Sequence, residues 1–199
     1  MVEEKDLSLP VISQYDRTIS SRKRLIKLHK QRRELHKEKL TSRIDTVTGV
    51  LNRAGFEREL RKSFAQSIRY KIPLSVIIAD LTRFKEINDK YGHHVGDAAL
   101  RYYAQSLSAI VRDADTVARY GGDEFAVIMP DTDATSAQQI IRERLKQKNF
   151  DSLTLTLPTG EAIPIKASYG VASFPQDGTS TEDIIKKADQ FMYIEKKNG

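Results

Sequence analysis

The stretch VARYGGDEFAVIMP, residues 117 to 130, decides the fold, because two glycines and two adjacent acids interrupt what is otherwise one apolar β-run. Gly121 and Gly122 predict a tight hairpin, since both central positions of a type I′ turn need a positive φ that glycine adopts without steric cost. The turn explains the glycines but not the acids. Asp123 and Glu124, beside a strand as apolar as FAVIM, indicate a paired positive charge, for which a metal ion is the first candidate.

Around this hairpin the sequence alternates between strand and helix patterns. The periodicity predicts helices at 52–70, 83–90, 97–111, 134–147 and 181–197, and strands at 74–80, 116–120, 125–129, 153–157 and 163–171. The order βαββαβ around the hairpin predicts an α+β fold of the ferredoxin-like, palm type, in which helices flank a central antiparallel sheet. We expect the split βαβ unit to place its helices on one face of that sheet.

The positive charge of the chain lies in one N-terminal segment. The formal net charge is +6, and residues 17–43 hold eleven Lys and Arg against two Glu. Residues 18–44 contain neither Pro nor Gly and predict one basic helix, so we expect residues 1–44 to precede a domain at 45–199. A solvated helix or linker, a dimerising stalk, and a basic arm for nucleic acid or an acidic membrane all remain possible interpretations.

The composition excludes several classes of protein. The chain has no cysteine, which removes disulfide frameworks and thiolate metal sites. It has no run of 18 apolar residues and no pattern typical of a secretory signal, so we expect no membrane span in this chain and a cytoplasmic location.

A further acid ends the buried strand predicted at 74–80. Asp80 alone would most simply cap the next helix, which is a common role for Asp. The strands at 74–80 and 125–129 are expected to be neighbours, however, which would place Asp80 and Asp123 at the same end of the sheet. Two carboxylates that converge with a backbone carbonyl suit Mg²⁺ or Mn²⁺, with phosphate oxygens and water completing the coordination shell.

Five motifs resemble the GGDEF family of diguanylate cyclases in the family's order and spacing. They are DTVTGVLNRAGF, DLTRFKEINDKYGHHVGDAAL, RYGGDEFAVIMP, SYGVASFP and ADQFMYIEKKNG, and they cover residues 45–199. The resemblance implies a palm-like domain that condenses two GTP into cyclic di-GMP with release of pyrophosphate. Because each domain would bind one GTP, it also implies a homodimer, with two metal ions in each active site.

The resemblance assigns roles to individual residues. Asp80, Asp123 and the carbonyl of Leu81 resemble the metal ligands, and Glu124 resembles the second catalytic acid beside Asp123. Either Asp123 or Glu124 could take the proton of the attacking hydroxyl. Substrate-binding roles are implied for Phe84, Lys85, Asn88, His93, Asp97, Gly122 and Lys196. Among these, Asn88 and Asp97 resemble the guanine readers, and Lys85 and Lys196 resemble the lysines that contact the triphosphate.

Arg112 and Asp115 form an RxxD pair, and five residues separate Asp115 from Gly121. A bare pair of this kind is usually an exposed ion pair at the end of a helix. Its placement resembles the inhibitory product site of the family, at which cyclic di-GMP would bind. The family pattern is not complete, because Thr82 stands where many relatives carry a second Asp.

Two other functions compete with an active cyclase. A catalytically silent receptor for cyclic di-GMP would need only the RxxD pair, yet the acids and Asn88 are all present. A nucleic-acid binder could use the basic helix, but the helix has no interleaved aromatic residues, so we expect no specific nucleic-acid partner.

Overall fold

The computed structural model describes residues 24, 26–30, 43–147 and 153–198, and the chain divides into two units, Met1–Ser42 and Arg43–Gly199. In the first unit, Arg24 and residues 26–30 are helical and lie within the predicted basic helix. The remainder of that predicted helix up to residue 42, including Leu25 and Leu35, lies outside the described residues. All of the motifs lie in the second unit.

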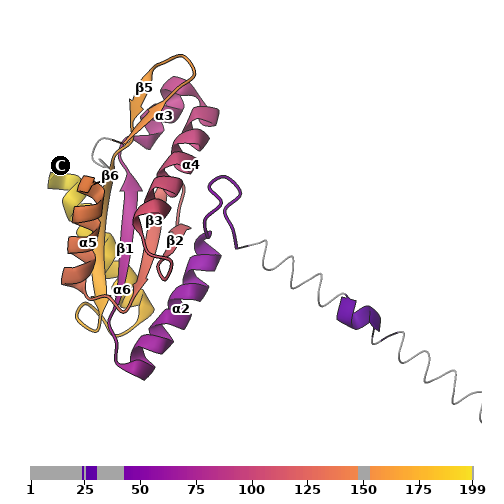
Figure 1. Ribbon diagram of the computed structural model, residues 1–199, viewed down its shortest axis with the longest axis vertical. Helices are drawn as coiled ribbons and strands as arrows, with labels where there is room; N and C mark the ends of the chain where they lie inside the picture. Colours follow the sequence, from indigo (N-terminus) through magenta and orange to yellow (C-terminus); the bar gives the residue numbers. More distant parts are fainter. Residues whose placement is uncertain (1–23, 25, 31–42, 148–152, 199) are drawn as a thin grey trace, which may run out of the picture. The chain divides into compact units, whose positions relative to one another are not determined.

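The second unit consists of helices and strands in alternation (Figure 1). The helices are α2 (Arg53–Tyr70), α3 (Phe84–Tyr91), α4 (His93–Ile110), α5 (Ala134–Gln147) and α6 (Thr181–Asn198). The strands are β1 (Leu74–Leu81), β2 (Thr116–Arg119), β3 (Glu124–Pro130), β4 (Thr154–Thr156), β5 (Ala162–Pro164) and β6 (Ala167–Phe174). Within the described residues, no helix is both long enough and apolar enough to cross a bilayer.

The central sheet is antiparallel and has the strand order β2-β3-β1-β6. β1 lies between β3 and β6, so the predicted pairing of the strand at 74–80 with the hairpin strand is confirmed. The β1–β3 pairing runs without a break from Leu74 opposite Pro130 to Asp80 opposite Glu124. The α+β fold with a central antiparallel sheet is therefore as predicted.

Helices cover both faces of this sheet. The helices of the split βαβ unit, α4 and α5, share one face as expected, and the other face is covered by α2 and α6, which lie outside that unit. α4 and α5 pack on the face that carries Ile77 and Ala79, whereas α2 and α6 pack on the face that carries Val76 and Ile78 (Figure 1). A strand whose two faces are both buried is apolar at nearly every position, and β1 is buried from Leu74 to Ala79, with Ser75 as the one polar residue of that stretch. The run LSVIIA already contained this signal.

Two predicted boundaries also differ from the structure. α4 begins at His93 and not at residue 97, because Gly92 adopts a φ of 82° and turns the chain directly from α3 into α4. The strand predicted at 163–171 is two strands in two sheets. β5 pairs with β4, and β6 joins the central sheet after a break at Ile165 and Lys166.

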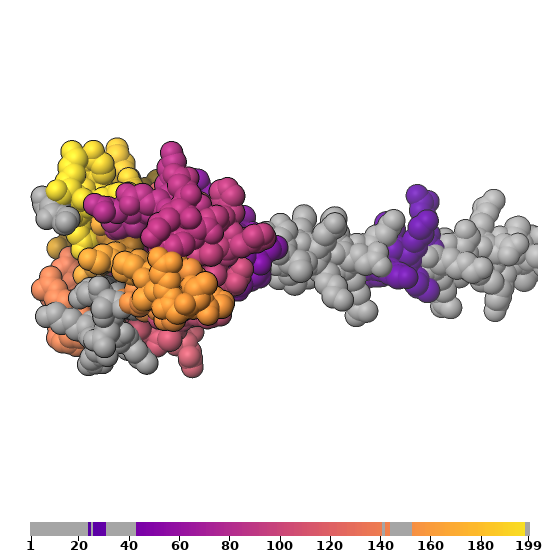
Figure 2. Space-filling view, turned by 90° about the horizontal axis from the view of Figure 1, so that it is seen from above, coloured from indigo at the N-terminus to yellow at the C-terminus, as the bar shows by residue number. Residues whose placement is uncertain are grey.

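The hairpin of β4 and β5 packs beside α3. Figure 2 shows its orange surface next to the magenta surface of α3 and α4. The hydroxyl of Tyr91 donates a hydrogen bond of 2.7 Å to Glu161, and the ammonium of Lys90 contacts the same carboxylate at 3.3 Å. These contacts attach the β4–β5 hairpin to the C-terminal turn of α3.

Candidate active site

The acids of the hairpin and of β1 meet at one end of the central sheet. Asp80 lies directly opposite Glu124 in the β1–β3 pairing. The next backbone amide of β1, that of Leu81, donates a 3.1 Å hydrogen bond to the carbonyl of Asp123. The expectation that Asp80 and Asp123 share one end of the sheet is confirmed, and Leu81, which follows Asp80, is hydrogen-bonded to Asp123.

The turn that carries Asp123 and Glu124, residues 121–124, is called the acidic turn below. The prediction of a type I′ turn with positive φ at both glycines was wrong, because neither Gly121 nor Gly122 has a φ in the left-handed region. The amides of Tyr120 and Gly121 both donate to the carbonyl of Glu124, at 2.8 and 3.2 Å, which makes a wider loop. A Cβ on Gly121 would lie 2.2 Å from a carboxylate oxygen of Glu124, so a larger residue there would require the Glu124 side chain to move.

Arg119, the last residue of β2, holds the acidic turn with its side chain. Its guanidinium donates to the carbonyl of Gly122 at 2.7 and 3.1 Å, and to both carboxylate oxygens of Asp45 at 3.2 Å. Asp45 also accepts hydrogen bonds from the amide and hydroxyl of Thr48, at 2.8 and 2.7 Å. Burial by itself raises the pKa of Asp45, but the Thr48 hydrogen bonds and the Arg119 charge outweigh it and lower that pKa. Asp45 therefore remains ionised and bound to Arg119 at neutral pH.

Lys196 of α6 reaches the carboxylate at the end of β1. Its ammonium lies 2.6 Å from Oδ1 of Asp80, and this pair joins residues from opposite ends of the domain sequence. The hydrogen bond to Asp80 is the main cause of a raised pKa for Lys196, and the charges of Asp123 and Glu124 add to it. The sequence placed Lys196 near phosphate oxygens, whereas in the structure it contacts a proposed metal ligand.

Glu124 lies in a field of negative charge. Burial raises its pKa, and the carboxylates of Asp80, Asp123 and Asp189 raise it further, while Arg53 opposes them. Among the described residues, no ion pair connects Asp123 or Glu124 to a cation. The end of the sheet thus carries unneutralised negative charge.

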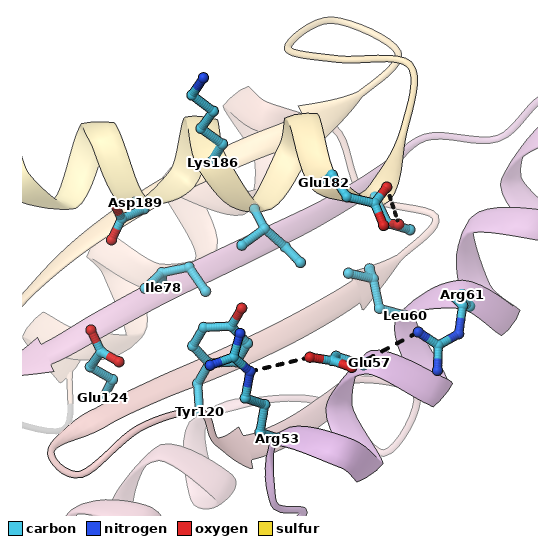
Figure 3. A pocket seen from close by; sticks show the side chains of 12 residues that line it. Arg53, Glu57, Leu60, Arg61, Ile78, Tyr120, Glu124, Glu182, Lys186 and Asp189 are labelled. Atoms are coloured by element: carbon cyan, nitrogen blue, oxygen red, sulfur yellow. Dashed lines mark hydrogen bonds and ion pairs between the residues drawn. The ribbon is translucent and has the colours of Figure 1, made fainter.

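A cleft with a volume of about 460 Å³ opens between α2 and α6, with Glu124 at one end. Figure 3 shows Asp189 of α6 on the same side of this cleft as Glu124, and Arg53 lying beside Tyr120. Arg53 lies 4.7 Å from the centre of the Tyr120 ring and 3.2 Å from the Glu57 carboxylate. Sequence reasoning assigned no role to Arg53, Tyr120 or Asp189, because only the packing of α2 and α6 on the sheet brings them to the acidic turn.

The residues proposed to read guanine lie where α3 meets α4. Asn88 packs against the start of α4 so closely that a Cβ on Gly96 would lie 1.9 Å from its Oδ1 and 3.3 Å from the ring of Phe84. Asp97 follows Gly96 directly and is half-buried, whereas His93 is exposed in the first turn of α4. Phe84, Asn88 and Asp97 therefore belong to one region. They lie in α3 and α4, within the helices that the sequence predicted at 83–90 and 97–111.

Lys85 is exposed in the first turn of α3, and no hydrogen bond or ion pair of its ammonium is seen within residues 43–147 and 153–198. Gly122 is also exposed, and a Cβ built on it would meet no atom within 4 Å. Both positions are therefore open to a ligand, which agrees with the roles that the sequence suggested for them.

Arg112 and Asp115 form a local network on the connection between α4 and β2. The Arg112 guanidinium contacts the Asp115 carboxylate at 3.3 and 3.4 Å and donates a 2.7 Å hydrogen bond to the hydroxyl of Thr132. The side chain of Asp115 is fully buried while that of Arg112 is 42% exposed. The guanidinium is thus oriented by two partners and keeps an exposed face for an anion.

The donor atoms at the end of the sheet fit a hard divalent cation. Carboxylate and carbonyl oxygens are the ligands that Mg²⁺ prefers, and Asp80 already holds a cationic group, the ammonium of Lys196. Within the described residues, no three acid or histidine side chains converge into a complete metal cage. Water and phosphate oxygens would complete the shell, as is usual for Mg²⁺. Acids at the end of the two central strands of an antiparallel sheet place the domain in the palm-type class.

Comparison with known proteins identifies the family within this class. The family described as "Diguanylate cyclase, GGDEF domain" matches residues 42–199. The probable diguanylate cyclase DgcC of Escherichia coli K12 is 35% identical over 195 residues, which are 97% of this chain and 51% of DgcC. The response regulator PleD of Caulobacter vibrioides is 35% identical over 155 residues, which are 78% of this chain and 34% of PleD. The chain belongs to the GGDEF family, and it spans about half of the length of DgcC.

Solved structures agree with this assignment. The isolated GGDEF domain of PA1120 from Pseudomonas aeruginosa superposes with a TM-score of 0.72 at 32% identity, over 78% of this chain and 90% of that one. The coiled coil and GGDEF domain of DgcB from Caulobacter crescentus, determined in complex with c-di-GMP, gives a TM-score of 0.76 at 26% identity. The DgcB match covers 94% of this chain and 96% of that chain.

Proposed function

We propose that this chain is a diguanylate cyclase that condenses two GTP into cyclic di-GMP and two pyrophosphates. The observation that carries the proposal is the convergence of Asp80, Asp123 and Glu124 at one end of the sheet. In the reaction, each 3′-hydroxyl attacks the α-phosphorus of the other GTP, a P–O bond forms, pyrophosphate leaves, and the hydroxyl proton is taken up. Each domain binds one GTP, so two domains face each other in a homodimer.

The chain's own residues bind and orient the substrate in this scheme. Asp80, Asp123 and the carbonyl of Leu81 would hold two Mg²⁺ or Mn²⁺ ions, which neutralise charge that develops on the phosphates. Phe84, Asn88, His93 and Asp97 would form the guanine site, while Lys85 and Lys196 contact the β- and γ-phosphates beside the backbone of Gly122. Either Asp123 or Glu124, which are adjacent in the acidic turn, could accept the proton of the attacking hydroxyl.

Formation of cyclic di-GMP from GTP and Mg²⁺, separated by chromatography, tests the proposal. Specific activity should rise with protein concentration in the micromolar range, since catalysis requires two domains. The alternative of a silent receptor predicts binding of cyclic di-GMP without any product formation. Absence of product at all protein concentrations, in a protein that binds cyclic di-GMP, would favour that alternative.

Replacing Asp97 by alanine is expected to raise the KM for GTP. A carboxylate can accept hydrogen bonds from N1 and the exocyclic amine of guanine, and loss of such a charge-assisted contact costs about 1.5 to 3 kcal/mol, or roughly 10- to 150-fold. Discrimination against ATP should weaken as well. Steady-state kinetics with both nucleotides measure this, and Asp89→Ala, which removes an exposed acid of α3, is the matched control. If the ratio of kcat/KM for GTP to that for ATP is the same in the parent and in Asp97→Ala, Asp97 does not recognise guanine.

Replacing Arg112 by alanine is expected to weaken inhibition by cyclic di-GMP. The guanidinium keeps an exposed face while Asp115 and Thr132 orient it, so its loss should raise the inhibition constant by about 10- to 150-fold. Progress curves, each normalised to its own initial rate, should straighten in this variant but not in Arg101→Ala, which removes an exposed arginine of α4. Equal curvature at equal product concentration would show that Arg112 is only a surface ion-pair residue.

A further inference from the structure

The contact between Lys196 and Asp80 has a consequence for metal binding that the proposed phosphate role of Lys196 does not include. The ammonium lies 2.6 Å from Oδ1 of Asp80, which is hydrogen-bonding distance for a charged donor. The Asp80 side chain is only 13% exposed, whereas that of Lys196 is 44% exposed. The carboxylate is thus fixed at the end of a buried strand, and the lysine is the partner that can move.

The position of Lys196 is maintained by the helix that carries it. α6 packs so closely on β6 that a Cβ on Gly170 would lie 2.1 Å from the carbonyl oxygen of Ala188. In the last turns of α6, the carboxylate of Glu195 accepts a hydrogen bond from the amide of Tyr169. The backbone at residue 196 is therefore anchored to the sheet, and only the flexible side chain of Lys196 has to move for its ammonium to leave Asp80.

We infer that the ammonium of Lys196 is the resident countercharge of Asp80 in the nucleotide-free protein, and that a divalent cation must displace it. The inference rests on the proposed function, because it takes Asp80 as a metal ligand. A metal ion and an ammonium compete for the same lone pairs of Oδ1. A metal ion on the other carboxylate oxygen would still lie within a few ångströms of the ammonium and be repelled by it.

Nucleotide binding removes this competition. The triphosphate offers the ammonium an alternative anion, so Lys196 can leave Asp80 at the same time as the cation arrives. The free protein should hold a divalent cation weakly, and the cation should load together with the nucleotide. Lys196 is in this sense a positioning residue for the metal, besides any contact that it makes with phosphate.

The test measures Mn²⁺ binding to the nucleotide-free protein by electron paramagnetic resonance or calorimetry, so no turnover is involved. Lys196→Met is expected to bind Mn²⁺ about tenfold more tightly than the parent. Even in a medium with the dielectric constant of water, the repulsion between a nearby ammonium and a divalent cation weakens the affinity for the cation by about tenfold. Lys196→Arg keeps the positive charge and should bind Mn²⁺ as weakly as the parent. Circular dichroism confirms that each variant is folded.

Lys197→Met is the matched control for the loss of one charge from α6. The ammonium of Lys197 lies 4.5 Å from the centre of the Tyr193 ring and makes no ion pair with Asp80. This variant should leave Mn²⁺ affinity unchanged. An equal gain in Lys196→Met and Lys197→Met would overturn the inference, because a general effect of net charge would then explain both.

Adding Asp80→Asn separates failure of the inference from failure of the proposed metal site. The double variant Lys196→Met/Asp80→Asn should lose the gain in Mn²⁺ affinity. If Mn²⁺ binding depends on Asp80 but Lys196→Met binds no better than the parent, the metal site stands and the inference is wrong. If Mn²⁺ binding is insensitive to Asp80→Asn in every background, the metal assignment itself is wrong, and the inference falls with it.

Discussion

Replacing Asp80 by asparagine is expected to reduce the rate of cyclic di-GMP formation by about 10²- to 10³-fold or more, with the fold retained. Asparagine has nearly the same size as aspartate but carries no charge, so the substitution removes a ligand that neutralises a divalent cation at the point where charge develops on the phosphates. Within the described residues, Asp80 forms an ion pair with Lys196, and its own side chain is only 13% exposed. Asparagine keeps an oxygen that accepts from the ammonium but loses the charge, so the free energy of unfolding should fall by about 1.5 to 3 kcal/mol.

The same substitution at the opposite end of the sheet provides the control. Asp131 follows the last residue of β3, is exposed, and has a φ of 49°, a conformation that asparagine also tolerates. Asp131→Asn should leave the rate unchanged within about twofold. A rate for Asp80→Asn close to that of Asp131→Asn would refute the role of Asp80 as a metal ligand.

Replacing Gly170 by alanine is expected to lower the free energy of unfolding by about 3 kcal/mol and to reduce activity as well. The new Cβ would lie 2.1 Å from the carbonyl oxygen of Ala188 and 2.2 Å from the amide nitrogen of Met192. Both atoms belong to the backbone of α6, so the helix has to move away from β6, which is a case of overpacking. Urea denaturation followed by circular dichroism measures the change.

Gly122→Ala is the matched control for stability. Its Cβ would meet no atom within 4 Å, and Gly122 is not in the left-handed region, so alanine can adopt its conformation. The denaturation midpoint of this variant should equal that of the parent. Equal midpoints for Gly170→Ala and the parent would mean that α6 can shift on the sheet without cost.

Much of the fold could be predicted from local patterns. The capped start of α2 is visible in the sequence because Asn52 precedes the helix, and its side chain accepts a hydrogen bond from the amide of Gly55 at 3.0 Å. Other features depend on tertiary contacts. The break between β5 and β6 arises because residues on either side of Ile165 and Lys166 join different sheets, while the sequence shows one continuous strand pattern.

The candidate site could be predicted where strand pairing determines it. Asp80 and Glu124 are opposite one another because the strands are in register, and their separation in the sequence does not matter. The pairing of Lys196 with Asp80 could not be predicted, since it depends on how closely α6 approaches β6. The predicted type I′ turn was wrong because the loop closes through the carbonyl of Glu124, which accepts from the amides of both Tyr120 and Gly121, and two adjacent glycines do not reveal this pairing.

Arg119 gives the domain a mechanical property that the sheet alone would not provide. One guanidinium binds Asp45, close to the first residue of the second unit, and also the carbonyl of Gly122 at the tip of the acidic turn. The backbone of Leu51 is also hydrogen-bonded to Val117 and Arg119 of β2. A displacement of the chain at Asp45 is therefore coupled to the tip of the acidic turn both by this guanidinium and by the edge strand that carries it.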